Sequence, residues 1–427
     1  MKKLLLFAGV LISFNVPAQK LSTEEKNILA YVQRQMPQTM QLLQQLVDIN
    51  SGTLNVEGVK KVGAILRAQF DRIGFTTEWI SLPDSMKRAG HLVANIKGSK
   101  GRKLFLIGHM DTVFEPDMPA NPYRVLDDST ATGQGVNDMK GGNVIILAAL
   151  EAIQRTVGLK NASVTAYFTG DEEDAGNPSS VSRADFINRA KSADIALGFE
   201  GAQGLSTVAT ARRGASGWIL RVSARQAHSS GIFQGNYGAI YEAARILTAF
   251  REKLGNQRYL TFNPGIIAGG SEVGYDSARL QARISAKTNI IAPSAIVHGD
   301  LRFLREAQKD SARMNMKAMV NMNNLPGTTA TISFEDGIPS MEPTKANNSL
   351  VFLLDKCTTD LGMGRTRAGD PGSRGAGDIS YVAKYLACLD GLGASGKGAH
   401  APGETLNLKE FPKLIERAAI FIYRLTR

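Results

Sequence analysis

The strongest constraint on the fold of this chain is that short apolar strands alternate with helices along its first half. Apolar residues recur at helical spacing in residues 22–48, 56–73 and 143–157. Short apolar runs that predict strands lie at 75–80, 91–97, 103–108, 162–169 and 195–199. Because parallel strands need crossover helices between them, this alternation predicts an α/β sandwich around a mostly parallel sheet.

The pattern changes near residue 212. From there the predicted order is strand, helix, strand, strand, helix, strand, at residues 215–223, 236–254, 278–288, 295–304, 306–323 and 328–335. That order is typical of a ferredoxin-like α+β module, and its two ends lie close together, as an inserted domain requires. A helix near 347–360 and a strand near 385–390 then resume the α/β pattern. We therefore expect a main domain of residues 19–211 and 336–427, interrupted by a smaller domain of residues 212–335.

The first 18 residues have a different character. Lys2 and Lys3 precede a short apolar stretch, and small residues follow it up to Ala18. This pattern predicts a secretory signal peptide, residues 1–18, cleaved after Ala18. The stretch is too short for a stable membrane span, although a retained N-terminal helix is the alternative. We expect a secreted or periplasmic protein.

The charge pattern argues against nucleic-acid binding. The formal net charge is +11, and removing Lys2 and Lys3 lowers it by two. The basic residues are scattered without a block or an aromatic-interleaved patch, so they indicate at most a mild attraction to acidic surfaces or substrates. The two cysteines, Cys357 and Cys388, could form a disulfide or remain two buried thiols. Since two cysteines do not make a zinc site alone, any metal must use His and carboxylates.

A histidine and an aspartate stand two positions apart where one predicted strand ends. The stretch GHMDTV contains His109 and Asp111, directly after the apolar run 104–107. Side chains two apart in extended backbone share a face, and a metal-binding His usually donates its other ring N–H to a carboxylate. We interpret His109 as a candidate metal ligand that Asp111 orients. The alternative is a strand-end histidine beside a solvated aspartate.

A glycine-rich loop with one acid precedes the predicted helix at 143–157. The loop reads GQGVNDMKGG, and the acid is Asp138. A carboxylate held on a tight loop can offer both oxygens, which suits a ligand shared by two metal ions. The alternative is that Asp138 caps the N-terminus of the helix.

Three further segments place acids or a histidine after strands or in loops. FTGDEEDAG, residues 168–176, contains four adjacent acids. They indicate either a solvated acidic loop or a metal ligand beside a general base. ALGFEG places Glu200 directly after a strand, and GKGAHAPGE places His400 in a loop, with Glu404 four residues on. Since sites collect at the carboxyl edge of a parallel sheet, we expect these segments to converge.

The charges of such a cluster balance if it binds two divalent cations. Asp138, Glu173 and Glu200 would contribute three negative charges, while two zinc ions contribute four positive ones and a bridging hydroxide closes the sum. We therefore expect two Zn²⁺ per chain, with Co²⁺ or Mn²⁺ as alternatives.

Taken in order, these motifs resemble those of the M20 family of metallopeptidases, and most of all its glutamate carboxypeptidase-like branch. The resemblance extends over nearly all of the chain after residue 18. It implies a zinc exopeptidase-type sandwich with an inserted ferredoxin-like lid or dimerisation domain. It also implies that Asp111 orients the first ligand and that Glu172 is the general base. The implied metal ligands are His109, Asp138, Glu173, Glu200 and His400.

The resemblance also assigns residues to substrate binding. AHSSG is similar to the family's His-Ala-Gly stretch, which implies that His228 reaches across a homodimer to the substrate carbonyl. The two serines after it stand where the family often has Ala and Gly. HGDLRF implies that Arg302 grips the substrate carboxylate, and GSRGAGDIS implies a substrate loop with contacts from Gly375 to Asp378. Glu at position 200 is typical of the family's carboxypeptidases and deacylases, whereas its aminopeptidases tend to have Asp.

The predicted reaction is zinc-dependent hydrolysis of an amide or peptide bond that releases a C-terminal amino acid from a small peptide. The nearest alternative is an N-acyl amino acid deacylase of aminoacylase or desuccinylase type, which would use the same residues. Alternatives from other classes are a catalytically silent binding protein, against which the chain keeps Glu172, and a basic envelope-binding module sensitive to salt. His91 and His298 lie in predicted strands and indicate structural roles.

Overall fold

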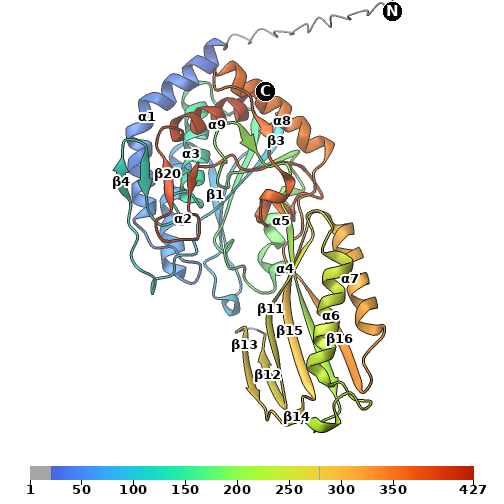
Figure 1. Ribbon diagram of the computed structural model, residues 1–427. Coiled ribbons are helices and arrows are strands. Elements are labelled where there is room, and N and C mark those ends of the chain that lie inside the picture. Colours follow the sequence, from blue (N-terminus) through green and yellow to red (C-terminus); the bar gives the residue numbers. More distant parts are fainter. Residues whose placement is uncertain (1–20, 278) are drawn as a thin grey trace, which may run out of the picture.

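The chain forms an α/β body from which a smaller, elongated part extends (Figure 1). The computed structural model describes residues 21–277 and 279–427. The predicted signal peptide, residues 1–18, lies outside this described range. Within it, no helix combines the length and the apolar character that crossing a membrane requires.

The body is built on a mixed sheet whose strand order is β1-β2-β6-β3-β7-β18. The pairings of β3 with β6 and β7, and of β7 with β18, are parallel. The pairings of β2 with β1 and β6, at one edge, are antiparallel. The predicted, mostly parallel sheet is therefore confirmed. The strands are β1 (Thr76–Ile80), β2 (His91–Ile96), β3 (Lys100–His109), β6 (Ala162–Thr169), β7 (Ile195–Gly198) and β18 (Ala387–Leu389).

Alternate side chains of β3 are buried on opposite faces of this sheet. Leu104 and Leu106 join the larger core, while Phe105 and Ile107 join a second core with Phe186. A strand buried on both faces reads as a continuous apolar run because its side chains point to alternate sides. The larger core is covered by α1 (Thr23–Val47), α2 (Val56–Arg72), α3 (Lys140–Thr156), α8 (Lys345–Asp360) and α9 (Phe411–Leu425). The second core is covered by α5 (Ala184–Ala190) and the short helix η4 (Asp378–Tyr381).

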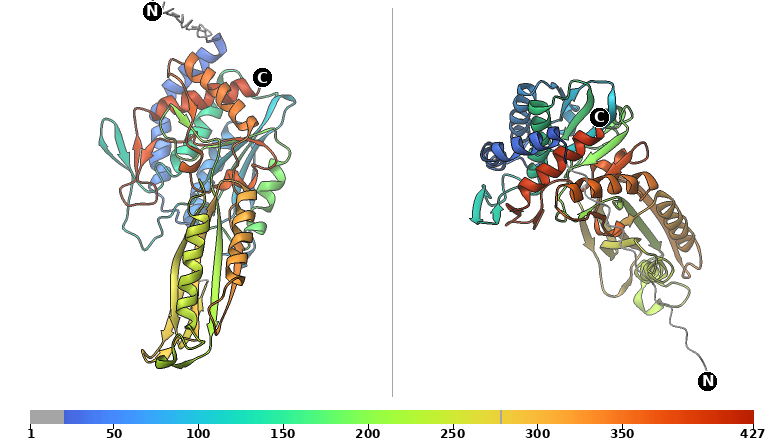
Figure 2. Two further views of the ribbon diagram at one scale, coloured as in Figure 1. Left: turned by 45° about the vertical axis from the view of Figure 1, so that its right-hand side comes forward. Right: turned by 90° about the horizontal axis from the view of Figure 1, so that it is seen from above.

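Residues 214–336, which we call the inserted part, form an antiparallel sheet with its own core. Its strand order is β11-β15-β9-β16, and α6 and α7 pack on the face that carries Trp218, Leu220 and Val297. Where the chain enters and leaves the body, Arg212 and Met341 exchange two backbone hydrogen bonds. Turned views show the same two parts (Figure 2). The elements are β9 (Gly214–Ala224), α6 (Gly238–Leu254), β11 (Thr261–Gly270), β15 (Ser294–Phe303), α7 (Glu306–Asn321) and β16 (Thr328–Asp336).

A strand does form within the expected segment 278–288, but its place in the sheet differs from the expected one. The strand paired with β15 is β11, whereas the expected segment 278–288 contributes β13 (Gln281–Ser285) to a hairpin with β12 (Glu272–Asp276). The sequence of β11 contains Pro264 and three glycines, residues that usually mark turns or interruptions of strands. An edge strand tolerates proline because one side of its backbone needs no partner, and the register shifts at Pro264, as at a bulge.

A small second sheet in the body brings two distant loops together. Its order is β19-β20-β5-β4, so residues near 131 lie beside residues near 406. The loops before α3 and between β19 and β20 are therefore neighbours. The strands are β4 (Arg124–Asp127), β5 (Thr130–Thr132), β19 (Gly396–Lys397) and β20 (Thr405–Asn407).

Candidate metal centre

Carboxylates and histidines from five segments converge at the carboxyl edge of the central sheet. His109 is the last residue of β3, the acids of the GDEE motif follow β6, and Glu200 follows β7. Asp138 lies in the loop before α3, and His400 lies in the loop between β19 and β20. Asp138 does not cap α3, which begins at Lys140 without a side-chain cap. Every metal ligand that the sequence suggested is thus near this edge.

Asp138 lies between the two histidines and faces both. His109 Nε2 is 3.1 Å from Asp138 Oδ1, and His400 Nε2 is 3.1 Å from Asp138 Oδ2. On the first side, Glu200 Oε1 is 3.5 Å from His109 Nε2. On the second side, Glu173 Oε2 is 3.2 Å from His400 Nε2. The two overlapping groups, His109–Asp138–Glu200 and Asp138–Glu173–His400, each keep one ligand atom per residue within 4.8 Å of the others, so each could hold a metal ion.

The environment of this cluster favours cations. Burial raises the pKa of Glu200 to about 7, and the negative charge of Asp138 adds to this effect. Hydrogen bonds to Asp138 and Glu173 raise the pKa of His400 to about 11. The buried Glu173 Oε1 has no hydrogen-bond partner among the described residues. Buried carboxylates with an unused oxygen are costly unless a cation or donor meets them, so the donor set fits divalent metal ions.

Asp111 fixes both the first histidine and the backbone that carries the next acids. Its carboxylate is fully buried, and Oδ1 lies 3.4 Å from His109 Nδ1. The backbone N–H of Glu172 donates to Oδ1 and that of Glu173 donates to Oδ2, both at 3.1 Å. Thr53 Oγ1 donates to Oδ2 at 2.7 Å. The backbone O of Asp111 also lies 3.0 Å from His109 Nδ1. Asp111 therefore orients the ring of one candidate ligand and holds the start of the acidic loop.

Glu172 lines a cavity of about 400 Å³ beside the cluster, together with Asp138, Glu200 and His400. Although part of its side chain is exposed to the cavity, burial and then the charge of Glu200 raise its pKa well above the usual range. One of its carboxylate oxygens lies within 4.8 Å of ligand atoms of His109 and Glu173. This is the geometry of a base that faces a reacting molecule at the edge of a metal site.

A buried arginine forms ion pairs with the acidic loop and with Asp378. Arg183 Nη1 donates to Asp171 Oδ1 at 2.5 Å, and Arg183 Nε donates to Asp378 Oδ1 at 2.7 Å. Thr169 Oγ1 donates to the other oxygen of Asp378. Asp378, which the sequence placed in a substrate loop, thus has a different environment: its carboxylate is buried in an ion-pair network. Gly375 of the same stretch does line the cavity.

Within one chain, His228 and Arg302 do not reach the cluster. His228 ends β10 (Ala227–His228), which pairs with β14 (Ile290–Ile291) at the end of the inserted part far from the body (Figure 1). Its Nδ1 lies 2.9 Å from Ser230 Oγ. Arg302 lies on β15, where its Nε donates to Asp300 Oδ2 at 2.8 Å. Neither residue lines the cavity at the cluster.

Two arginines at the cavity were missed in the sequence. Arg212 is buried, its Nη2 lies 3.9 Å from Glu200 Oε2, and its Nε donates to Gly375 O at 3.0 Å. Arg374 Nη2 donates to Gly201 O at 2.7 Å. A signal existed for the first, because the pair Arg212-Arg213 stands where the α/β pattern breaks. No spacing rule, however, ties an arginine at a domain boundary to a site elsewhere.

The other histidines and the cysteines lie outside the cluster. His91 is buried, with Nε2 3.0 Å from Ser182 O, and burial lowers its pKa. His298 is hydrogen-bonded to Tyr275 on the inserted part. Cys357 and Cys388 are both buried and free in the described chain, so the disulfide that the sequence left open is absent there.

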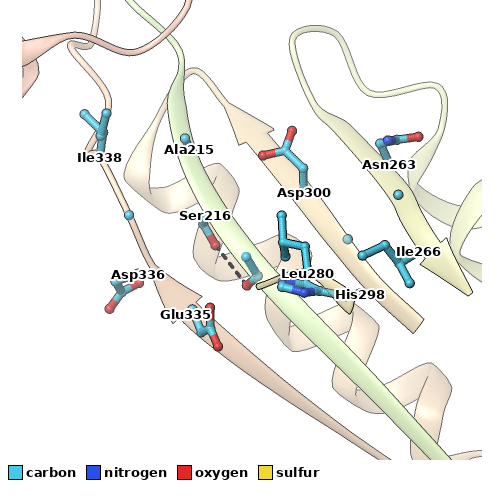
Figure 3. A pocket seen from close by; sticks show the side chains of 14 residues that line it. Ala215, Ser216, Asn263, Ile266, Leu280, His298, Asp300, Glu335, Asp336 and Ile338 are labelled. Atoms are coloured by element: carbon cyan, nitrogen blue, oxygen red, sulfur yellow. Dashed lines mark hydrogen bonds between the residues drawn. The ribbon is translucent and has the colours of Figure 1, made fainter. Parts of the chain in front are cut away.

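A second cavity, of about 540 Å³, lies on the inserted part. Figure 3 shows it on the sheet, surrounded by Ser216, Asp300, His298 and Glu335. Its walls contain none of the clustered metal-ligand groups found among the described residues. Of these two cavities, it is the smaller one that adjoins metal-ligand groups among the described residues.

A mixed α/β sheet whose carboxyl edge gathers two overlapping His-carboxylate groups and a base defines a metal-dependent hydrolase. The sequence profile of "Peptidase family M20/M25/M40" matches residues 105–424. The chain therefore belongs to peptidase family M20, and it is a metallopeptidase of that family.

Similar proteins span almost the whole chain. Carboxypeptidase G2 from Pseudomonas sp. (strain RS-16) is 26% identical over 422 residues, which cover 97% of this chain and 96% of the relative. Aminopeptidase PepT from Bacillus cereus has a similar structure, with TM-score 0.69, 16% identity, and coverage of 92% and 99% of the two chains. The Bacillus subtilis YXEP protein, described as a dinuclear metal-binding peptidase of the M20 family, has TM-score 0.63, 15% identity, and coverage of 93% and 99%. Peptidases of different specificity thus share this fold.

Proposed function

We propose that the protein is a glutamate carboxypeptidase-like exopeptidase that hydrolyses an amide or peptide bond and releases a C-terminal amino acid. The observation that carries this proposal is the position of Glu172, which faces the cavity between two candidate metal groups that share Asp138. The 26% identity with carboxypeptidase G2 over nearly the whole chain supports the carboxypeptidase direction.

His109, Asp138 and Glu200 would hold one Zn²⁺, and Asp138, Glu173 and His400 the other, with Co²⁺ or Mn²⁺ as alternatives. When bound, such ions polarise a carbonyl and make water more acidic.

The protein's own side chains would position the site and transfer the proton. Asp111 keeps the His109 ring and the Glu172 backbone in place. Glu172 accepts a proton from the attacking water and returns it to the leaving nitrogen, which is general acid–base catalysis.

The inserted part would bind the carboxylate of the substrate. It would also carry the side chain that each subunit contributes to the site of its partner. Arg302 presents a guanidinium that suits a planar carboxylate, but it must first release Asp300. We infer that residues 214–336 act as a lid and as the contact between two copies of the chain. In support, the edge strand β11 exposes Ile267, and α6 exposes Ile240 and Tyr241 nearby. An apolar strip beside an unpaired strand edge favours edge-to-edge pairing.

The proposal predicts hydrolysis of a specific substrate class. Zinc-loaded protein should release the C-terminal residue from N-acyl-glutamates and from dipeptides, measured as free amino acid, and a chelator should abolish the release. Because the same residues would serve a deacylase, the panel includes N-acetyl and N-succinyl amino acids. Faster turnover of these than of any peptide or aroyl-glutamate would favour the deacylase instead. Zinc binding without turnover of any substrate would favour a silent binding protein.

A further inference from the structure

One carboxylate outside the candidate metal groups accepts several backbone hydrogen bonds from the loop that carries Asp138. Glu404 is fully buried. The backbone N–H groups of Asn137 and Asp138 both donate to its Oε1 at 2.7 Å. The N–H of Gly135 donates to its Oε2 at 3.0 Å. Three backbone N–H groups, all more than 260 positions away in sequence, thus donate hydrogen bonds to a single side chain.

A carboxylate is the group that this loop requires. The loop turns sharply, with Gly135 at φ +69°, so its N–H groups point inward to one spot and not to a strand or helix partner. Hydrogen bonds from backbone N–H to an ionised oxygen are about twice as strong as neutral ones. Without an acceptor, each of these buried N–H groups would lose its hydrogen bond to water and gain none in return, which destabilises the loop. The carboxylate therefore sets the shape of the loop.

The same residue also ties this loop to the loop of the second histidine. Glu404 follows His400 by four positions and directly precedes β20. Its backbone O accepts hydrogen bonds from Thr132 Oγ1 at 2.7 Å and from Gly133 N–H at 3.3 Å. Main-chain and side-chain contacts of Glu404 thus join the segments that bring Asp138 and His400 to 3.1 Å from each other.

We propose that Glu404 is a positioning residue that holds Asp138 where both candidate metal groups can share it. Glu404 is not a ligand, because its two oxygens are occupied by the loop. It acts through the backbone at residues 135–138. The inference rests on the proposed metal-dependent function, but it makes a separate claim about metal affinity.

The experiment measures Zn²⁺ affinity of the full chain by competition with a chromophoric chelator. Glu404→Gln keeps the size of the side chain but presents one acceptor and one NH₂ group to three donors. Mutation of groups that hold metal ligands in place typically lowers metal affinity by about 10–100-fold, and we expect a loss in this range. The absorption spectrum of the Co²⁺-loaded variant should also differ from that of the wild type, because the geometry around Asp138 changes.

The matched control is Glu242→Gln in the inserted part. Glu242 is also fully buried and also accepts a backbone N–H, from Leu325 at 3.0 Å. It should lower stability without changing Zn²⁺ affinity, so a purely structural effect of losing a buried carboxylate is separated from positioning.

A double-mutant comparison tests the route of the effect. In the Asp138→Asn background, Glu404→Gln should lower Zn²⁺ affinity by much less than it does alone, since coupled residues are not additive. Unchanged affinity of a folded Glu404→Gln chain, or fully additive losses, would overturn the proposal. If Glu404→Gln does not fold, Glu404→Asp takes its place, and wild-type affinity there would likewise overturn it. A wild type that binds Zn²⁺ but hydrolyses nothing would defeat the proposed function and leave this comparison intact.

Discussion

At the scale of residues, the acidic motif GDEE combines three different roles in adjacent positions. Asp171 is buried against Arg183, Glu172 faces the cavity, and Glu173 points to His400. Asp174 turns outward, with a side chain that is 60% exposed and 2.6 Å from Arg88. Adjacent acids repel one another unless the fold separates their environments, and here it does so residue by residue. Of these four acids, Glu172 is the one that lines the cavity.

Glu172→Gln should remove activity while leaving the metal site. The amide cannot accept the proton, and general acid–base catalysis contributes about 10²–10⁴-fold, so kcat should fall by a factor in that range. Zinc content, measured by elemental analysis, should stay at the wild-type value. Asp174→Asn, one loop position away from the metal groups, is the control and should keep its kcat. A Glu172→Gln enzyme with normal kcat would remove Glu172 from the role of base.

The candidate ligands could be found in the sequence because each follows an apolar strand or lies in a glycine-rich loop. Their positions relative to the strands can be recognised locally in the sequence. Because the carboxyl ends of parallel strands lie at one edge of the sheet, these side chains then meet there. Glu404 and Arg212 could not be found in this way. Their roles depend on which backbone groups and carboxylates meet them across the fold, and sequence spacing does not encode such contacts. The contact between Asp378 and Arg183 is of the same kind, because the two residues lie far apart in sequence.

At the scale of elements, the segment from β6 to α5 is held by one buried cation. Arg183 lies 2.5 Å from Asp171 and 2.7 Å from Asp378, and all three side chains are buried. The charges of the two aspartates more than offset the burial of the guanidinium and raise the pKa of Arg183. This network connects the loop that carries Glu172 to η4 on the second core.

Replacement of this cation should destabilise the protein strongly. Arg183→Met would leave two buried carboxylates without their cationic partner, and breaking such a network typically costs about 3–5 kcal/mol. The measurement is the free energy of unfolding by denaturant titration. The control is Arg189→Met on α5, whose ion pairs with Glu78 and Asp185 are partly exposed and should be worth about 0–1 kcal/mol. Equal losses in the two variants would contradict the structural role of Arg183.

The alternation of strands and helices was predictable because apolar periodicity is a local property of the chain. Strand β11 was not, because its glycines and Pro264 are acceptable only at an edge, and edge position is a property of the assembled sheet. The predicted strand at 278–288 corresponds to β13, which pairs with β12 and not with β15. The short strands β19 and β20 carried no periodic signal at all, yet they place His400.

At the scale of the whole molecule, the inserted part carries His228 away from the cluster of its own chain. His228 lies on β10 at the far end of that part (Figure 1). Its side chain is exposed, with Ser230 as a neighbour. A catalytic contribution from His228 therefore requires the site of a second copy. A C2 dimer would provide this reciprocally, because each chain would offer its histidine to the other.

Mixing two inactive variants tests this arrangement. His228→Ala and Glu172→Gln homodimers should each have low activity, for different reasons. After subunit exchange, half of the dimers are mixed, and each mixed dimer contains one site with both Glu172 and the partner's His228. We expect recovery of about a quarter of wild-type activity, which follows from the two-fold symmetry. Sedimentation should show a dimer for both variants. If the chain is monomeric, or if mixing restores nothing although subunits exchange, His228 has no role across an interface.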